Sequence, residues 1–306
     1  MKTTMTQKDD LFLTLDFGGS SVKGAVMSRD AQIHERFSLA SQADTYEQWL
    51  DTFTPLFDEL AARFALKGIA ISTCGAVNVD SGVIEGASAL PYIHDIDVRS
   101  LYQTRFNLPV ELENDGCCAA LAEDWLGAGK EDDEFCLLVL GSGIGGAIVR
   151  DGAVIKGTHL HAGEFGYCIL RFEQGQPITY SNAASTRALV ENVALAKNQK
   201  VEDFDGVKVF SLYEQGDNDV LPLVEQWYGD LATILFNVQY SLDPKRILLG
   251  GAVSRSPRLI DNINRKLDEL QAWIPIARIR PVPALTQFGN DANLIGALKH
   301  FLNRQG

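Results

Sequence analysis

Cysteine is scarce in this chain, and its spacing does not fit a disulfide framework. The 306 residues include five cysteines, an odd number with no C-x-x-C pair: Cys74, Cys117, Cys118, Cys136 and Cys168. Small disulfide-stapled secreted domains carry even numbers of cysteines at regular spacings. We therefore expect reduced thiols and a cytoplasmic protein.

Long apolar runs and an excess of basic residues are also lacking. No apolar stretch approaches the ~20 residues that cross a bilayer, and the opening MKTTMTQKDD has no apolar signal core. We therefore expect no membrane partner. Asp and Glu number 40 against 27 Lys and Arg, a net charge of −13. Because a nucleic-acid footprint needs a basic face, this balance favours a small-molecule partner.

Apolar residues, by contrast, suffice for two packed cores. Hydrophobic residues make up 46% of the chain, with 15 Phe and 4 Trp, which is typical of a globular protein. A chain of 306 residues is long enough for two domains. No low-complexity linker interrupts it, so any second domain is packed rather than tethered.

Hydrophobic periodicity predicts alternating strands and helices. Residues 11–37 indicate a β-meander, and 44–65 an amphipathic helix. The pattern then predicts, in order, a strand at KGIAIST, a helix at VRSLYQTRFN, a strand at PVELEN and a helix at DGCCAALAEDWLG. Further helices are predicted over 183–199 and 222–242. Residues 245–270 predict a strand, a glycine turn and then a long helix, and NDANLIGALKHFL predicts a terminal helix.

The opening pattern recurs in the middle of the chain. LDFGGSSVKGAV, residues 15–26, gives a strand, a turn of glycines and hydroxyls, and a second strand. Residues 134–157, EFCLLVLGSGIGGAIVRDGAVIKG, repeat that order. Two copies predict an α/β fold with duplicated α/β domains around a central cleft.

These two turns carry more chemistry than a hairpin needs. Glycines let backbone N–H groups approach phosphate oxygens, hydroxyls add donors, and a carboxylate can orient hydrated Mg²⁺. An ordinary hairpin turn explains either stretch alone, but two favour a nucleotide held between them. The candidate residues are Asp16, Gly18, Gly19, Ser20, Ser21 and Lys23 in the first turn, and Gly141, Ser142, Gly143, Gly145 and Gly146 in the second.

A dinucleotide site is a weaker interpretation of the second turn. Gly141, Gly143 and Gly146 match G-x-G-x-x-G. A dinucleotide-binding turn must open a helix, whereas these glycines lead into the β-like stretch AIVRDGAVIKG. A third glycine turn, LLGGAVS, does precede a helix and contains Gly250 and Gly251.

Two polar stretches are candidates for substrate chemistry. Asn114 and Asp115 lie where a strand gives way to a helix. Asp115 is there either an N-cap or a general base with Asn114 orienting the substrate, and both hold if Asn114 or the backbone does the capping. HLHAGEFGY, which contains Glu164, is a metal site, a loop of incidental polarity or, as we favour, a sugar-binding turn. His34 and His300 are interpreted as structural or surface residues.

In this order the motifs resemble the ROK family of bacterial sugar kinases and regulators. LDFGGSSVKGAV and LGSGIGGAIVRDGAVIKG resemble its two phosphate motifs, and LENDGCCAALAE its catalytic motif. HAGEFGY is similar to its sugar-binding G-E-x-G-H motif and ILLGGAVSRSP to its adenosine turn. The resemblance covers residues ~11 to 302, nearly the whole chain.

The resemblance implies a two-lobed actin-like ATPase (ribonuclease H-like) fold. The implied parts are an N-terminal lobe of residues 1–118, a larger lobe of 119–285, and a C-terminal helix, 286–306, that packs back on the first lobe. It also implies a homodimer.

The resemblance further implies an ATP-dependent kinase. Asp115 would take a proton from the 6-hydroxyl of a sugar, and that oxygen would attack the γ-phosphate of ATP with Mg²⁺ offsetting charge. Gly75, Asn114 and Glu164 would contact the sugar. Gly250 and Gly251 would lie near the adenine and ribose, and Asp16 would reach Mg²⁺ through water.

Three departures from the family pattern bear on the substrate. Tyr167 ends the motif that usually ends in His, and 168–186 contain only Cys168 of the family's zinc-binding cysteines, so we expect no zinc. The sugar-contacting glutamate that follows those cysteines has no match. GEFGY, GASA and a late GND resemble the zinc-less β-glucoside kinases, so a β-glucoside such as cellobiose is favoured. Glucose, N-acetylglucosamine or N-acetylmannosamine is the alternative.

A repressor or a non-catalytic sugar sensor is the competing class. ROK repressors carry a helix-turn-helix domain ahead of the first phosphate motif, and only about ten residues precede it here. A sensor is also expected to lose Asp115 or the phosphate glycines. Their presence favours the kinase.

Overall fold

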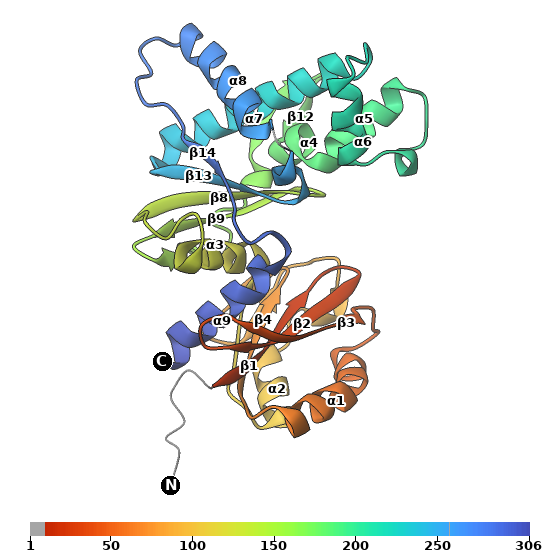
Figure 1. Cartoon of the computed structure of the whole chain (residues 1–306), viewed down its shortest axis with the longest axis vertical. Helices are drawn as coiled ribbons and strands as arrows, with labels where there is room; N and C mark the ends of the chain where they lie inside the picture. Colours follow the sequence, from red (N-terminus) through yellow and green to blue (C-terminus); the bar gives the residue numbers. More distant parts are fainter. Residues whose placement is uncertain (1–9, 257) are drawn as a thin grey trace. The chain divides into compact units, whose positions relative to one another are not determined.

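Two units, each assembled from segments that are not contiguous in sequence, make up the described residues, 10–256 and 258–306 (Figure 1). In this computed structural model the first unit takes in the chain up to Trp125, together with Lys156–His161 and Asn290–Gly306. The second takes in Leu126–Ile155 and Ala162–Gly289. Each unit contains its own five-stranded sheet.

The sheet of the first unit has the order β3-β2-β1-β4-β7. Its strands are β1 (Leu11–Phe17), β2 (Ser21–Ser28), β3 (Ile33–Ala40), β4 (Leu66–Thr73) and β7 (Val110–Asn114). The first three form the predicted antiparallel meander, while β4 and β7 run parallel to β1. The carboxyl ends of β1, β4 and β7 therefore lie at one edge, where Phe17, Thr73 and Asn114 are in register.

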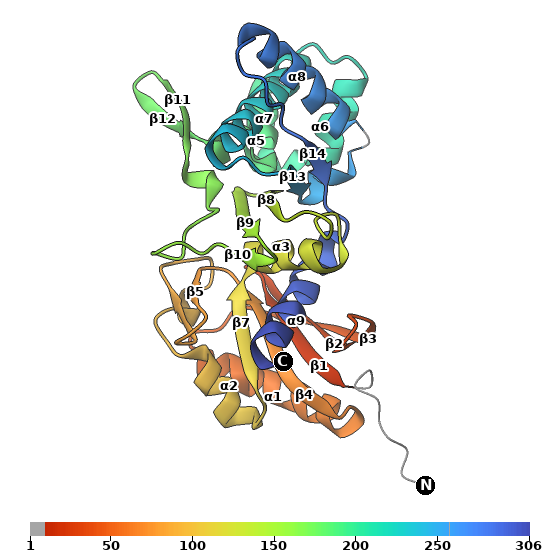
Figure 2. The ribbon, with the colours of Figure 1, turned by 90° about the vertical axis from the view of Figure 1, so that its left-hand side faces the viewer.

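Helices cover both faces of this sheet. The amphipathic helix α1 (Tyr46–Arg63) and α2 (Val98–Phe106) bury their aromatic side chains in the core with the sheet. The C-terminal helix α9 (Ala292–Gln305) contacts β1, β4 and β7 from the other side (Figure 2). The helix α3 (Asp115–Leu126) follows β7 directly, and the small hairpin of β5 (Ala76–Asn78) and β6 (Val83–Glu85) follows β4.

A glycine sets the close approach of α9 to α3. A Cβ on Gly296 would lie 1.7 Å from the carbonyl oxygen of Cys118, inside any real contact distance. Gly68 on β4 likewise leaves room for the ring of Phe301 in α9. The C-terminal helix therefore packs backbone to backbone against the helix that begins at Asp115.

The second unit repeats the topology of the first. Its sheet has the order β10-β9-β8-β13-β14. When the strands of each sheet are numbered along the chain, both sheets have the same order, 3-2-1-4-5. The strands are β8 (Glu134–Leu140), β9 (Ile144–Arg150), β10 (Ala153–Val154), β13 (Arg246–Gly250) and β14 (Pro283–Leu285). This repeat confirms the predicted duplicated α/β fold.

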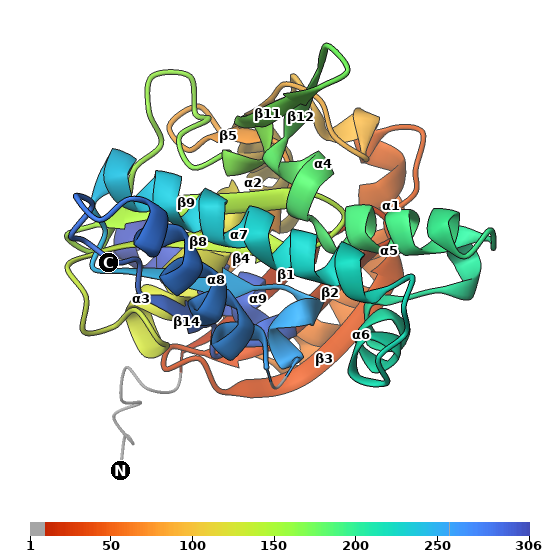
Figure 3. The ribbon, with the colours of Figure 1, turned by 90° about the horizontal axis from the view of Figure 1, so that it is seen from above.

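Helices α7 (Leu221–Leu242) and α8 (Leu259–Trp273) lie side by side in the second unit (Figure 3). Their apolar residues form its core with β8 and β13. The hairpin of β11 (Ile169–Glu173) and β12 (Gln176–Thr179) projects from the rest of the unit (Figure 2). The remaining elements are α4 (Tyr180–Ala184), α5 (Thr186–Ala196), α6 (Gly206–Glu214) and the short 3-10 helices η2 (Pro91–Ile93), η3 (Phe165–Tyr167), η4 (Val201–Asp203), η5 (Ala252–Arg255) and η6 (Gly289–Asp291).

The single helix predicted over 183–199 is wrong in one respect. The structure has two helices, because Ser185 adopts an extended conformation and its side chain accepts a hydrogen bond from the backbone of Ala188 as the N-cap of α5. Within the described ranges, no helix combines the length and the apolar character that a bilayer span requires.

Candidate active site

Asp16, at the end of β1, is a buried carboxylate held by two donors. Its Oδ1 accepts hydrogen bonds from Ser72 Oγ at 2.9 Å and from Asn293 Nδ2 at 3.0 Å. Burial raises the pKa of Asp16, while the hydrogen bonds from Asn293 and Ser72 and the charge of Lys23 oppose that rise. The side chain is therefore fixed in place at a cost in solvation.

The turn after Asp16 is open to solvent. Gly18 N–H donates to the carbonyl of Ser21 at 3.1 Å, which closes the turn. Gly19 and Ser20 are exposed at its tip, and Lys23 is exposed on β2 opposite Asp16 in the strand register. The candidate phosphate-binding residues of the first motif thus lie together at the edge of the sheet where β1 ends.

The geometry shows which side chain caps α3. Asn114 Oδ1 accepts from the backbone N–H of Cys117 at 3.1 Å, so Asn114 caps α3. Asp115 Oδ1 accepts from the N–H of Gly116 at 2.8 Å, and the residue is half-buried. The cap therefore does not require the Asp115 carboxylate, and the role of Asp115 as a general base stays a prediction.

Gly75 lies beside Asn114 at the same edge of the sheet. Asn114 Nδ2 donates to the carbonyl of Gly75 at 3.0 Å. Gly75 has φ of +98°, and a Cβ there would lie 2.7 Å from Ile84 Cγ2 and 2.9 Å from His94 Cε1. Only glycine fits this turn without strain. The structure thus brings together three of the predicted substrate residues, Gly75, Asn114 and Asp115.

A short polar chain that the sequence analysis missed borders this turn. Cys74 Sγ donates to Ser88 Oγ at 3.3 Å, and Ser88 Oγ lies 2.7 Å from His94 Nε2. Burial raises the pKa of the Cys74 thiol, and the charge of Asp115 raises it further. The Cys74 thiol is therefore harder to ionise than an ordinary cysteine, and it lies within electrostatic reach of Asp115. GASA was noted as a motif, but nothing local in it pairs Ser88 with Cys74.

The second glycine turn, between β8 and β9, is shaped by backbone and side-chain contacts. Gly141 N–H donates to the carbonyl of Gly143 at 2.9 Å, and Arg187 Nε donates to the carbonyl of Ser142 at 2.8 Å. A Cβ on Gly141 or Gly145 would meet nothing within 4 Å. Gly146 differs, because a Cβ there would lie 2.3 Å from the carbonyl oxygen of Leu137 on β8.

The remaining candidates of the second unit lie against its sheet. Glu164 is half-buried between two glycines that pack on β9, since a Cβ on Gly163 would lie 2.8 Å from Ala147 Cα and one on Gly166 would lie 2.2 Å from the carbonyl oxygen of Ile144. Gly250 ends β13, and Gly251, with φ of +93°, packs on the carbonyl of Leu140.

Metal ligands are few around these residues. No group of three or more His, Cys, Asp or Glu side chains able to hold a metal ion occurs among residues 10–256 and 258–306. Tyr167, at the position of the family's histidine, is 78% exposed. A hydrated Mg²⁺ keeps most of its waters and needs few carboxylates, so the single, firmly held Asp16 fits such an ion.

Comparison with known proteins supports the same family. The family model described as ROK family matches residues 12–304. A β-glucoside kinase of Klebsiella pneumoniae is 33% identical over 289 residues, which cover 94% of this chain and 94% of that protein. A solved ROK family protein from Streptococcus pneumoniae in complex with sucrose is 32% identical with a TM-score of 0.88, covering 96% of this chain and 99% of that one.

A more distant structure supports the fold alone. A ROK family glucokinase from Streptomyces griseus, solved with glucose and AMPPNP, has a TM-score of 0.77 at 24% identity, covering 97% of this chain and 100% of that one. These likenesses confirm the predicted actin-like ATPase fold. On the family match over residues 12–304, the chain belongs to the ROK family.

Proposed function

We propose that the protein is an ATP-dependent sugar kinase that phosphorylates the 6-hydroxyl of a β-glucoside such as cellobiose. The observation that carries this proposal is the arrangement at the end of β7. Asn114 caps α3 and holds the Gly75 carbonyl, while the half-buried Asp115 is not needed as the cap. Membership of the ROK family supports the reaction class.

In the proposed reaction Asp115 is the general base. Its carboxylate accepts the proton of the sugar hydroxyl, the hydroxyl oxygen forms a bond to the γ-phosphorus, and the bond from that phosphorus to the ADP oxygen breaks. Gly75, Asn114 and Glu164 contact the sugar hydroxyls. Gly75 and Asn114, joined by a hydrogen bond in the first unit, orient the reacting hydroxyl toward Asp115 and lower the entropy cost of the transfer.

The nucleotide contacts are assigned to glycine turns of both units. In the first unit they comprise Asp16, Gly18, Gly19, Ser20, Ser21 and Lys23. In the second they comprise Gly141, Ser142, Gly143, Gly145 and Gly146 at the phosphates, with Gly250 and Gly251 at the adenosine. Asp16 would hold a hydrated Mg²⁺, which would offset negative charge on the phosphates.

The substrate class follows from what replaces the family's zinc motif. Tyr167 is exposed where other members have a metal-binding histidine, and the glutamate that contacts the sugar in those members has no counterpart. In this proposal, the loss of that glutamate and of the zinc-held loop makes room for an aglycone or a second sugar. The Klebsiella pneumoniae relative named as a β-glucoside kinase supports this choice over glucose or an N-acetylhexosamine.

A coupled ADP-release assay with ATP and Mg²⁺ tests the proposal. The panel comprises glucose, cellobiose, gentiobiose, arbutin, N-acetylglucosamine and N-acetylmannosamine. We expect a β-glucoside to exceed every monosaccharide by more than about tenfold in kcat/KM, equivalent to about 1.4 kcal/mol. A preferred monosaccharide contradicts the substrate class but not the kinase. Folded protein that releases no ADP with any sugar contradicts the kinase and favours a sugar sensor.

We also propose that the protein is a homodimer. Family resemblance is the support for this assembly. Sedimentation equilibrium over a range of protein concentrations measures it directly. A mass of a single chain at all concentrations contradicts the dimer.

A further inference from the structure

Strand β7 carries two buried carboxylates that the proposed reaction does not use. Glu111 is 4% exposed and Glu113 is 3% exposed. Alternate residues of a strand point to the same face, so both side chains lie on one side of the strand that ends at Asn114. A buried carboxylate is costly unless it is paired. The identity of each partner therefore shows what the carboxylate does.

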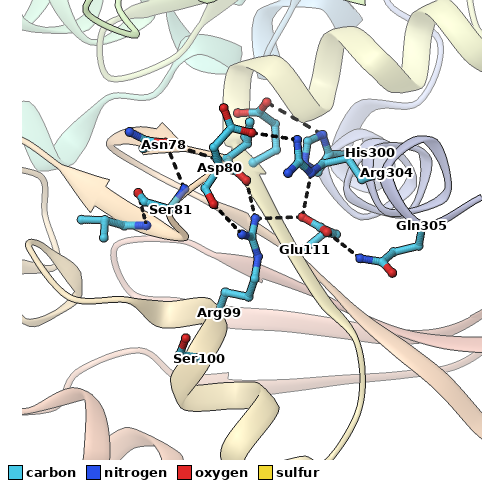
Figure 4. A network of polar contacts seen from close by, with 12 residues as sticks. Asn78, Asp80, Ser81, Arg99, Ser100, Glu111, His300, Arg304 and Gln305 are labelled. Atoms are coloured by element: carbon cyan, nitrogen blue, oxygen red, sulfur yellow. Dashed lines mark hydrogen bonds and ion pairs between the residues drawn. The ribbon is translucent and has the colours of Figure 1, made fainter.

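Glu111 lies between Arg99 on one side and Arg304 and Gln305 on the other in the polar network drawn in Figure 4. It accepts hydrogen bonds from Arg99 Nη2 at 2.9 Å, Arg304 Nε at 3.0 Å and Gln305 Nε2 at 2.7 Å. These donors come from α2 and from the last turn of α9. Glu111 therefore ties helices on both faces of the sheet to β7.

Glu113 has different partners, and they lie nearer to the site. Its carboxylate forms an ion pair with Lys156 and accepts the backbone N–H of Asn114 at 2.6 Å. Burial raises the pKa of Glu113, and the charge and hydrogen bond of Lys156 oppose that rise. Lys156 belongs to the short segment Lys156–His161, which packs with the first unit.

His300 does not take the place of Lys156 as the charge partner. Its Nδ1 lies 3.9 Å from Glu113 Oε2, beyond hydrogen-bond distance. Burial lowers the pKa of His300 to about 3, with the charges of Arg304 and Lys156 adding to the effect. The imidazole is therefore neutral near neutral pH, and Lys156 supplies the cation at this point.

We propose that Glu113, held by Lys156, is a positioning residue for the base Asp115, an inference that rests on the proposed kinase function. The Glu113 carboxylate holds the backbone N–H of Asn114, the residue directly before Asp115. The Asn114 side chain then sets both the start of α3 and the Gly75 turn. Without Lys156 the Glu113 carboxylate no longer holds the backbone N–H of Asn114 in place, and the Asp115 carboxylate can then move.

The same ion pair also bears on a second substrate residue. Lys156 fixes the start of the segment from which the chain continues to Glu164. One pair of side chains therefore joins the strand of the base to the segment that leads to the sugar contact. Displacements of about 1 Å at a reacting group cost on the order of 100-fold in rate, so even a small relaxation here is measurable.

The variants separate positioning from stability. Glu113→Gln and Lys156→Met each break the pair, Glu113→Gln combined with Lys156→Met removes both charges, and Lys156→Arg keeps the charge. Glu111→Gln is the matched control, because it changes an equally buried carboxylate on the same face of β7 whose partners do not include Asn114. All are assayed well below the lowest unfolding temperature.

The readout is kcat and KM for ATP and for the preferred sugar. We expect each single change of the pair to lower kcat by about 10- to 100-fold, with the KM for ATP within about twofold of wild type. The double variant should lose no more than the worse single variant, because the two residues act through one contact. Lys156→Arg should recover most of kcat, and Glu111→Gln should lower the unfolding temperature alone.

Three results overturn the inference, and the last of them is distinguishable from the first two. If the wild type is active and the double variant, which leaves no unpaired buried charge, keeps wild-type kcat, then the pair is structural only. The same conclusion follows if Glu111→Gln lowers kcat as much as Glu113→Gln. If the folded wild type transfers no phosphate to any sugar, the proposed function fails first, and the inference fails with it.

Discussion

Asn114 Nδ2 donates to the carbonyl of Gly75 at 3.0 Å while Asn114 Oδ1 accepts from the N–H of Cys117 at 3.1 Å. One side chain therefore joins the ends of β4 and β7 and also caps α3. The strand that delivers Asp115 is fixed without the Asp115 carboxylate having to cap the helix. This relationship underlies the assignment of Asp115 as a base.

Replacement of Asn114 is expected to affect both stability and sugar binding. Asn114→Ala loses the helix cap, worth about 1 kcal/mol, and the tie to Gly75. We expect a lower unfolding temperature and a KM for the sugar raised at least about tenfold, a loss of about 1.4 kcal/mol. Asn114→Asp keeps a cap acceptor but not the amide donor. It should recover stability without recovering sugar binding, and a wild-type KM in this variant contradicts the role given to the Gly75 contact.

Gly75 and Gly86 form a matched pair for testing the turn. Both have positive φ, +98° and +86°, but a Cβ on Gly75 meets Ile84 and His94 within 2.9 Å whereas one on Gly86 meets nothing within 4 Å. Gly75→Ala should destabilise the fold by about 1–3 kcal/mol and raise the KM for the sugar. Gly86→Ala should lose only the stability that corresponds to the strain of a positive φ, because its Cβ meets no neighbouring atom. Equal losses in thermal denaturation would show that the contacts with Ile84 and His94 do not matter.

Replacement of Asp16 by Asn is expected to increase stability and to decrease activity. The carboxylate is buried, and its two donors, Ser72 and Asn293, can also hydrogen-bond to an amide oxygen. Asp16→Asn should therefore raise the unfolding temperature of the protein without nucleotide, because it removes a buried charge. It should lower kcat/KM for MgATP by about 10- to 100-fold. A variant that is both less stable and fully active contradicts the assignment.

Glu225 makes the stability of the second unit pH-dependent. Burial raises the pKa of Glu225, but hydrogen bonds from Tyr213, Lys266 and Arg265 together outweigh it and hold the pKa at about 2. Because the folded pKa lies below the ordinary value of 4.5, the stabilisation is complete above that value and is lost as pH falls toward 2.

Denaturant titrations measure this dependence. The side chain is about a third exposed, so at pH 7 Glu225→Gln should cost only about 1 kcal/mol. The difference from wild type should shrink between about pH 4.5 and pH 2, the window between the two pKa values. The exposed Glu202→Gln is the control. A Glu225→Gln deficit that is constant with pH contradicts the electrostatic account.

Local patterns were sufficient to predict the strands of the sheets and the start of the helix at Asp115. The glycine turns that follow strands and the helix that begins at Asp115 could be predicted because strand periodicity and turn residues are local features of the sequence. The duplication of the α/β fold followed from the likeness of 15–26 and 134–157, whereas the strand order came from the structure. The break at Ser185 was missed, because a side chain that caps a new helix looks like one more helical residue when the apolar spacing continues across it.

The partners that hold the site could not be predicted in the same way. Asn293 reaches Asp16 from the other end of the chain, and Lys156 reaches Glu113 from a segment after β10. Such contacts depend on which faces of the fold meet, and no local spacing encodes that. The late GND motif was a signal next to Asn293, although it indicated only the subgroup. The division at residues 118 and 285 and the roles of the individual site residues stay predictions.

The most direct test of the central claim compares wild type with Asp115→Ala in sugar-dependent ADP release, with nucleotide binding and thermal unfolding measured on the same samples. If Asp115 is the base, the variant should bind ATP and unfold like wild type while kcat falls by about 10²–10⁴-fold. A folded Asp115→Ala protein that keeps kcat within about tenfold of wild type would contradict the assignment of Asp115 as the base.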